Sequence, residues 1–220
     1  MSELSRELKK NELEDFVVLI AEWIKHNQSI FFSVAGIIIG FIIFGIFFFS
    51  QFYTLNNRAS EKLAFGQSML YQGQAEQGSK LIDEVINQYT KTPAALQAIL
   101  IKADYLMSLK KNDEAEKLLL TAADKEKPKE IIPLILSSLG SVQENEGKYQ
   151  QALGTYNSFL TRFPDNYIAP KIYESLGRVY ELINSPVEAK AIYEKMVLLY
   201  PSTPWATKAQ ERAMLLTNKI

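Results

Sequence analysis

The chain has 220 residues, with 24 Lys or Arg against 25 Asp or Glu, so its formal net charge is −1. This balance leaves no basic footprint for nucleic acid. The sequence contains no cysteine, which excludes disulfide bonds, thiolate metal sites and cysteine nucleophiles, and which permits an oxidising compartment without requiring one.

Residues 1–28 form a leading segment that contains a predicted amphipathic helix. Apolar side chains recur there at i, i+3, i+4, i+7 and i+8: Phe16, Leu19, Ile20, Trp23 and Ile24. The spacing predicts one apolar stripe along a helix. Its flanks are mostly acidic, whereas helices that bind membrane surfaces usually carry Lys and Arg beside the stripe. Two interpretations are open: the helix docks on a partner, or it simply leads into the next segment.

Residues 29–53 are predicted to form a transmembrane helix. The twenty residues from Ile30 to Phe49 carry no charge. As a helix with a rise of about 1.5 Å per residue they would cover about 30 Å, the thickness of a hydrocarbon core. The run is longer than the apolar region of a signal peptide, and no small-x-small cleavage site follows it. We therefore expect a permanent anchor through one span of a lipid bilayer.

The Lys and Arg counts on the two sides of the span predict its orientation. Four such residues precede it, and two lie in the twenty residues that follow. The positive-inside rule then places the N-terminus in the cytoplasm and the rest of the chain across the membrane. Within the span, Gly36 and Gly40 form a small-xxx-small pattern that lets two membrane helices pack closely, so a homodimer or a partner helix is possible there.

Residues 54–220 contain a repeat with a period of 37 residues. Small residues recur at Gly66, Ala103, Gly140 and Gly177, and a second small set follows twelve residues later at Gly78, Ala115, Ala152 and Ala189. Four residues further on stand bulky residues, namely Ile82, Leu119, Tyr156 and Tyr193. This pattern predicts pairs of closely packed helices with a large side chain between them. Such units stack into a solenoid, because none of them can bury its apolar face alone.

The last units follow the tetratricopeptide pattern: Tyr173-x2-Leu176-Gly177-x2-Tyr180, then Ala189-x3-Tyr193, then Pro201. The earlier units keep less of it. After Pro201 we expect one capping helix, with Thr203 as its N-cap and Pro204 at its first position.

The predicted fold class is therefore all-α: an N-terminal amphipathic helix, a single transmembrane helix and a tetratricopeptide-like α-solenoid of about four helix pairs plus a capping helix. Terminal repeats need a polar outer face, and we expect Lys208, Glu211 and Arg212 to supply it.

No residue pattern points to catalysis. His26 is the only histidine, and no serine or carboxylate constellation accompanies it. The sequence contains no GxGxxG, P-loop, HExxH or calcium-loop motif. We expect no enzymatic activity, no cofactor and no metal.

The expected activity is protein binding. In tetratricopeptide domains the first helix of each pair lines a concave groove, where extended or helical segments bind. The repeat register predicts eleven groove positions: Gln67, Leu70, Tyr71, Asp104, Met107, Ser108, Ser141, Glu144, Asn145, Arg178 and Glu181. Among them, Tyr71 and Met107 suit apolar side chains, and Arg178 suits a carboxylate. Each position could instead be an ordinary solvated one.

The layout resembles the ancillary SecYEG translocon subunit family, in which a short cytoplasmic start and one span precede a periplasmic tetratricopeptide-like domain. The span, the leading stretch and the unit ends "FPDNYIAP" and "YPSTPWA" carry the resemblance. It implies a bacterial inner-membrane protein that associates with translocon subunits and hands clients to periplasmic chaperones. The unit ends are also similar to those of periplasmic repeat proteins of outer-membrane assembly. A self-associating scaffold of an envelope assembly or outer-membrane biogenesis complex is therefore the alternative.

Overall fold

The computed structural model describes residues 16–126 and 128–217, and the first part of the predicted leading segment lies outside these ranges. The chain divides into two compact units, Met1–Thr54 and Leu55–Ile220. Helix α2 (Gln28–Tyr71) contributes its first residues to one unit and its last residues to the other.

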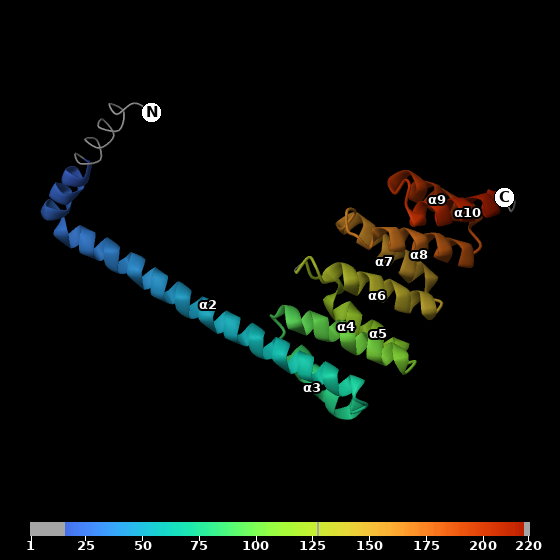
Figure 1. Cartoon of the computed structure of the whole chain (residues 1–220), viewed down its shortest axis with the longest axis horizontal. Helices are drawn as coiled ribbons and strands as arrows, with labels where there is room; N and C mark the ends of the chain where they lie inside the picture. Colours follow the sequence, from blue (N-terminus) through green and yellow to red (C-terminus); the bar gives the residue numbers. More distant parts are fainter. Residues whose placement is uncertain (1–15, 127, 218–220) are drawn as a thin grey trace. The chain divides into compact units, whose positions relative to one another are not determined.

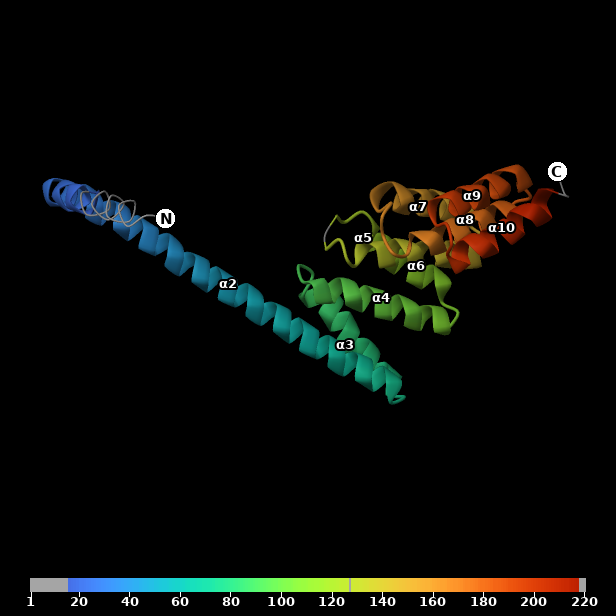
Figure 2. The ribbon, with the colours of Figure 1, turned by 45° about the horizontal axis from the view of Figure 1, so that its top comes forward.

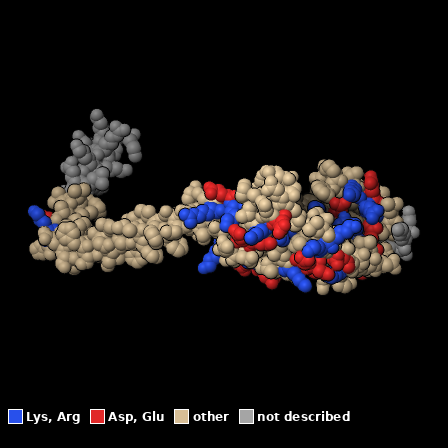
Figure 3. Space-filling view, turned by 90° about the horizontal axis from the view of Figure 1, so that it is seen from below, with Lys and Arg blue, Asp and Glu red and all other residues tan. Residues whose placement is uncertain are grey.

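In the first unit, residues 16–26 are helical, and α2 follows after a break at Asn27. The apolar stripe of the short helix is largely exposed, with Phe16 and Trp23 more than half accessible. Among the described residues, α2 is the one helix long and apolar enough to cross a membrane. Its side chains between Ile30 and Phe49 point outward all round, and Figure 3 shows no charged side chain on the visible face of this stretch.

The second unit consists of helices throughout its described residues (Figures 1 and 2). After the end of α2 come α3 (Ala75–Gln88), α4 (Pro93–Ser108), α5 (Asn112–Ala123), α6 (Ile132–Asn145), α7 (Tyr149–Arg162), α8 (Ala169–Leu182), α9 (Pro186–Leu199) and α10 (Pro204–Thr217). The end of α2 pairs with α3, then α4 with α5, α6 with α7 and α8 with α9, while α10 packs on the last pair. The predicted all-α solenoid of four pairs plus a capping helix is confirmed.

The repeat register predicted the core correctly. Ala103, Ala115, Ala152 and Ala189 are fully buried, as are Ile82 and Leu119. In the last two pairs the ring of the bulky residue covers the glycine: Tyr156 lies over Gly140, and Tyr193 lies over Gly177. Small side chains let the helix axes approach, and the bulky residue fills the space beside them.

Each pair turns between its helices through one residue with positive φ, and these residues repeat with the same period: Gly73, Lys110, Gly147 and Asn184. In the third pair, Gly147 N–H donates to Glu144 C=O, and Lys148 N–H donates to Gln143 C=O. The same two hydrogen bonds recur in the other three turns. This is a helix C-cap that requires a left-handed residue, which glycine adopts at least cost.

Side-chain caps and proline start two of the helices. Thr92 Oγ1 accepts from Ala95 N–H at 3.3 Å, and Pro93 follows as the first residue of α4. Thr203 Oγ1 accepts from Ala206 N–H at 3.2 Å at the start of α10, as predicted. Proline costs little there, because the first helical N–H has no partner within the helix.

Candidate interaction groove

The eleven predicted groove positions all lie on the first helices of the pairs. The end of α2 carries Gln67, Leu70 and Tyr71; α4 carries Asp104, Met107 and Ser108; α6 carries Ser141, Glu144 and Asn145; α8 carries Arg178 and Glu181. None of the eleven is buried. We call this row of surfaces the groove face, and its two halves differ in chemistry.

The first half contains a hollow of about 290 Å³ between α2 and α4. Six side chains line it: Gln67, Leu70, Tyr71, Ile101, Asp104 and Tyr105. We call it the N-terminal hollow. Four of these residues were predicted from the register. Ile101 and Tyr105 were missed, although they stand two residues before and after the small residue of α4 and so flank the predicted positions.

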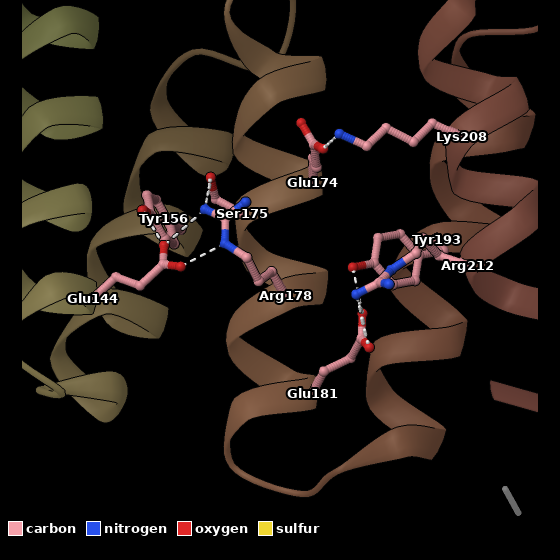
Figure 4. A network of polar contacts seen from close by, with 9 residues as sticks. All are labelled: Glu144, Tyr156, Glu174, Ser175, Arg178, Glu181, Tyr193, Lys208 and Arg212. Atoms are coloured by element: carbon pink, nitrogen blue, oxygen red, sulfur yellow. Dashed lines mark hydrogen bonds and ion pairs between the residues drawn. The ribbon is translucent and has the colours of Figure 1, made fainter. Parts of the chain in front are cut away.

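The second half is crossed by ion pairs between neighbouring first helices (Figure 4). Arg178 of α8 holds Glu144 of α6 with two hydrogen bonds, from Nε at 2.5 Å and from Nη2 at 2.9 Å. One helix further along, Arg212 of α10 lies 3.0 Å from Glu181 of α8. The carboxylate that Arg178 meets in the structure therefore belongs to the chain itself.

Lys208, Glu211 and Arg212 are exposed on α10, as expected of a polar face, and two of them also form ion pairs that the sequence did not predict. Helix α10 packs through Ala206, Ala209 and Ala213, which are buried. This packing turns Lys208 and Arg212, one helical turn apart, toward α8, where Lys208 pairs with Glu174 (Figure 4). Both cations belong to the ion pairs of the groove face.

Buried tyrosines hold two of these glutamates from the other side. Tyr156 O–H donates to Glu144 Oε2 at 3.1 Å, and Tyr193 O–H donates to Glu181 Oε1 at 2.8 Å. Burial raises the pKa of both phenols well above its ordinary value, and the neighbouring carboxylates raise it further. The tyrosines therefore remain protonated donors, and each glutamate links the two helices of its own pair to the next pair.

A small cavity of about 190 Å³ lies beside these ion pairs, among α8, α9 and α10. Arg178, Lys208 and Arg212 line it together with Trp205 and Met196. Each of the three cations already has a carboxylate partner within the chain. In this half of the groove face the charged groups are therefore paired with one another.

These features define the class of protein: a solenoid of helix pairs with an exposed groove face, of the tetratricopeptide type. Residues 21–203 match the family described as the tetratricopeptide repeat-like domain, and the chain belongs to that family. The fold is typically a non-catalytic scaffold for protein–protein interaction.

Solved structures of other repeat proteins share the fold. A putative kinesin light chain of Podosopora anserina is 16% identical with a TM-score of 0.57, covering 74% of this chain and 86% of that chain. YrrB, described as a TPR protein with an unusual peptide-binding site, is 15% identical with a TM-score of 0.52, covering 70% and 74%. MamA from AMB-1 is 19% identical with a TM-score of 0.50, covering 64% and 73%. At these identities the similarity shows the fold alone. No curated protein matches the chain.

Proposed function

We propose that this protein is a membrane-anchored interaction module that binds polypeptide segments on its groove face. The N-terminal hollow carries the proposal, because Tyr71 is 83% exposed there although it stands on a packed helix. Leu70, Ile101 and Tyr105 lie beside it. Aromatic and apolar side chains that a rigid scaffold holds at the surface are typical of binding sites.

We further propose that the chain is a single-pass protein of a bacterial inner membrane, with residues 1–28 in the cytoplasm and the repeat unit in the periplasm. The apolar, outward-facing stretch from Ile30 to Phe49 supports a span. The Lys and Arg asymmetry and the resemblance to ancillary translocon subunits support the orientation.

Because the chain has no cysteine, single introduced thiols can test this topology. A Gln151→Cys variant, changed at an exposed position of α7, should react with a membrane-impermeant maleimide in intact spheroplasts. A Ser5→Cys variant should react only after detergent is added. Labelling in the reverse order would overturn the proposed localisation and leave a cytoplasmic scaffold.

The proposed partners are translocon subunits, periplasmic chaperones and their clients. A photo-crosslinking amino acid at Tyr71, followed by identification of the products from intact membranes, tests this directly. Tyr167, in the connection before α8, is 80% exposed and provides a matched control position. We expect products that contain translocon subunits or exported chains from position 71 and not from position 167. Equal products from both positions would contradict binding on the groove face.

The alternative function is a self-associating scaffold of an envelope assembly. Gly36 and Gly40 support it, because a β-carbon built at either position meets nothing within 4 Å and the helix face is open there. In that case crosslinking would recover mainly the chain itself. Self-association would then be lost when both glycines are changed to isoleucine.

A further inference from the structure

We infer that the N-terminal hollow selects segments in which Lys or Arg stands beside a bulky apolar side chain, with Asp104 as the partner of the cation. This inference rests on the proposed function and specifies the chemistry of the bound segment.

The repeat itself shows what is unusual about this position. The residue directly after the small residue of each first helix is Gln67, Asp104, Ser141 and Arg178 in turn. The residue four places after the small residue is Leu70, Met107, Glu144 and Glu181 in turn. In the second half of the groove face, Glu144 of one unit is bound by Arg178 of the next.

Between α2 and α4 the two equivalent positions are occupied by Leu70 and Asp104. Asp104 therefore places a carboxylate where a later unit places a guanidinium, and Leu70 offers it no opposite charge. No ion pair or side-chain hydrogen bond is formed by Asp104 with any other residue in the described ranges. Every glutamate of the second half that bridges two first helices has a cation in contact. Asp104 thus occupies a position that forms an ion pair between first helices in a later unit, but here its carboxylate has no cation partner among the described residues.

Asp104 is exposed at the rim of the hollow, and its neighbours remove part of the water around its carboxylate. Burial raises the pKa of the Asp104 carboxyl above its ordinary value, which reflects partial desolvation by its neighbours. A cation delivered by a ligand would relieve this cost, because an ion pair in a partly desolvated site is screened less than one in open water.

The walls of the hollow suit the rest of such a segment. Tyr71 and Tyr105 present aromatic rings that accept a guanidinium or an ammonium through cation–π contacts. Leu70 and Ile101 offer an apolar floor for a neighbouring side chain and for the methylene stem of Arg or Lys. An acidic segment would instead meet the Asp104 charge without compensation. Charge and shape therefore favour a basic, apolar segment as the occupant.

The test uses the full-length protein in nanodiscs of neutral lipid, so that basic peptides do not bind the bilayer. Three short fluorescent peptides share one sequence around a central Phe and differ only in the flanking residues, which are Arg, citrulline or Glu. Citrulline keeps the shape of Arg without its charge. We expect the Arg peptide to bind roughly three- to tenfold more tightly than the citrulline peptide, and the Glu peptide to bind most weakly.

The Asp104→Asn variant should bind the Arg peptide only as well as the citrulline peptide, while Asp104→Lys should come to favour the Glu peptide. Asp124→Asn, the same change at an exposed acid beyond α5, should leave the preference intact. Because Asp104 forms no ion pair or side-chain hydrogen bond among the described residues, its variants should also melt like the parent protein.

The outcomes separate the two proposals. If Asp104→Asn keeps the preference for Arg, the inference is wrong, while binding on the groove face stands. If no peptide binds, or if binding survives a Tyr71→Ala change, the hollow is not a binding site and the proposed function fails with the inference.

Discussion

Replacing Gly177 with leucine should lower the free energy of unfolding of the repeat unit by about 3 kcal/mol or more. A β-carbon built on Gly177 would lie 2.6 Å from both Cε1 and Cζ of Tyr193. The ring cannot simply move aside, because Tyr193 is 3% exposed and its hydroxyl is bound to Glu181. The added side chain must therefore separate α8 from α9 or break this hydrogen bond.

Gly154 provides the matched control. It lies in α7, and a β-carbon there meets nothing within 4 Å. Gly154→Ala should therefore raise stability by about 0.5–1 kcal/mol, since alanine loses less backbone entropy in a helix. Both variants can be compared in urea by circular dichroism on the fragment from about Asn56 onward, which we expect to fold alone. An unchanged midpoint for Gly177→Leu would mean that the close helix contact is not where the repeat register places it.

The fold could be predicted from the sequence because close packing of the helix pairs requires small and bulky residues at fixed, repeating positions. Few residues other than glycine fit under a tyrosine ring, as at Gly140 and Tyr156. Because each unit has a contact of this kind at the same place, small and bulky residues recur in the sequence every 37 residues. The turns follow the same period, but only three of their four left-handed residues are ones that favour this conformation. Lys110 carries no such signal, so its φ of 60° could not be predicted.

The ion pairs of the groove face could not be predicted from the sequence in the same way. Glu144 and Arg178 are 34 residues apart, while Glu181 and Arg212 are 31 apart, so the two pairs do not share one spacing. Long charged side chains reach whichever helix face lies opposite, and that depends on how the helices pack. For the same reason the sequence did not predict that Lys208 and Arg212 of α10 pair with glutamates of α8.

The ion pair of Arg178 makes this residue a poor choice for a substitution that is meant to test binding alone. Changing Arg178 to alanine would leave the Glu144 carboxylate, whose side chain is 11% exposed, without its cation. Such a change would cost stability as well as any affinity, because a desolvated charge would lose its partner. Tyr71, Met107 and Asn145 contribute no ion pair in the described chain, so they test binding with less disturbance of the fold.

Separating the repeat unit from its anchor should reduce client capture by roughly a hundredfold at equal expression. Anchoring confines the groove face to a thin layer beside the membrane, which raises its effective concentration toward membrane partners without any new contact. Modest affinity in the N-terminal hollow then suffices, and it lets clients leave again. The comparison sets the full chain against residues 54–220 exported alone, each with and without alanine at Tyr71, Met107 and Asn145.

We expect full complementation of a deletion only from the unaltered full chain, and crosslinking of clients to fall with either change. Tyr167→Ala should leave both readouts unchanged, because it removes an equally exposed ring from a different part of the repeat unit. Complete rescue by the free unit would remove tethering from the mechanism, since affinity alone would then suffice. Undiminished crosslinking in the triple variant would instead move the binding surface away from the groove face. The two results are independent, because anchoring changes local concentration and the three side chains change affinity.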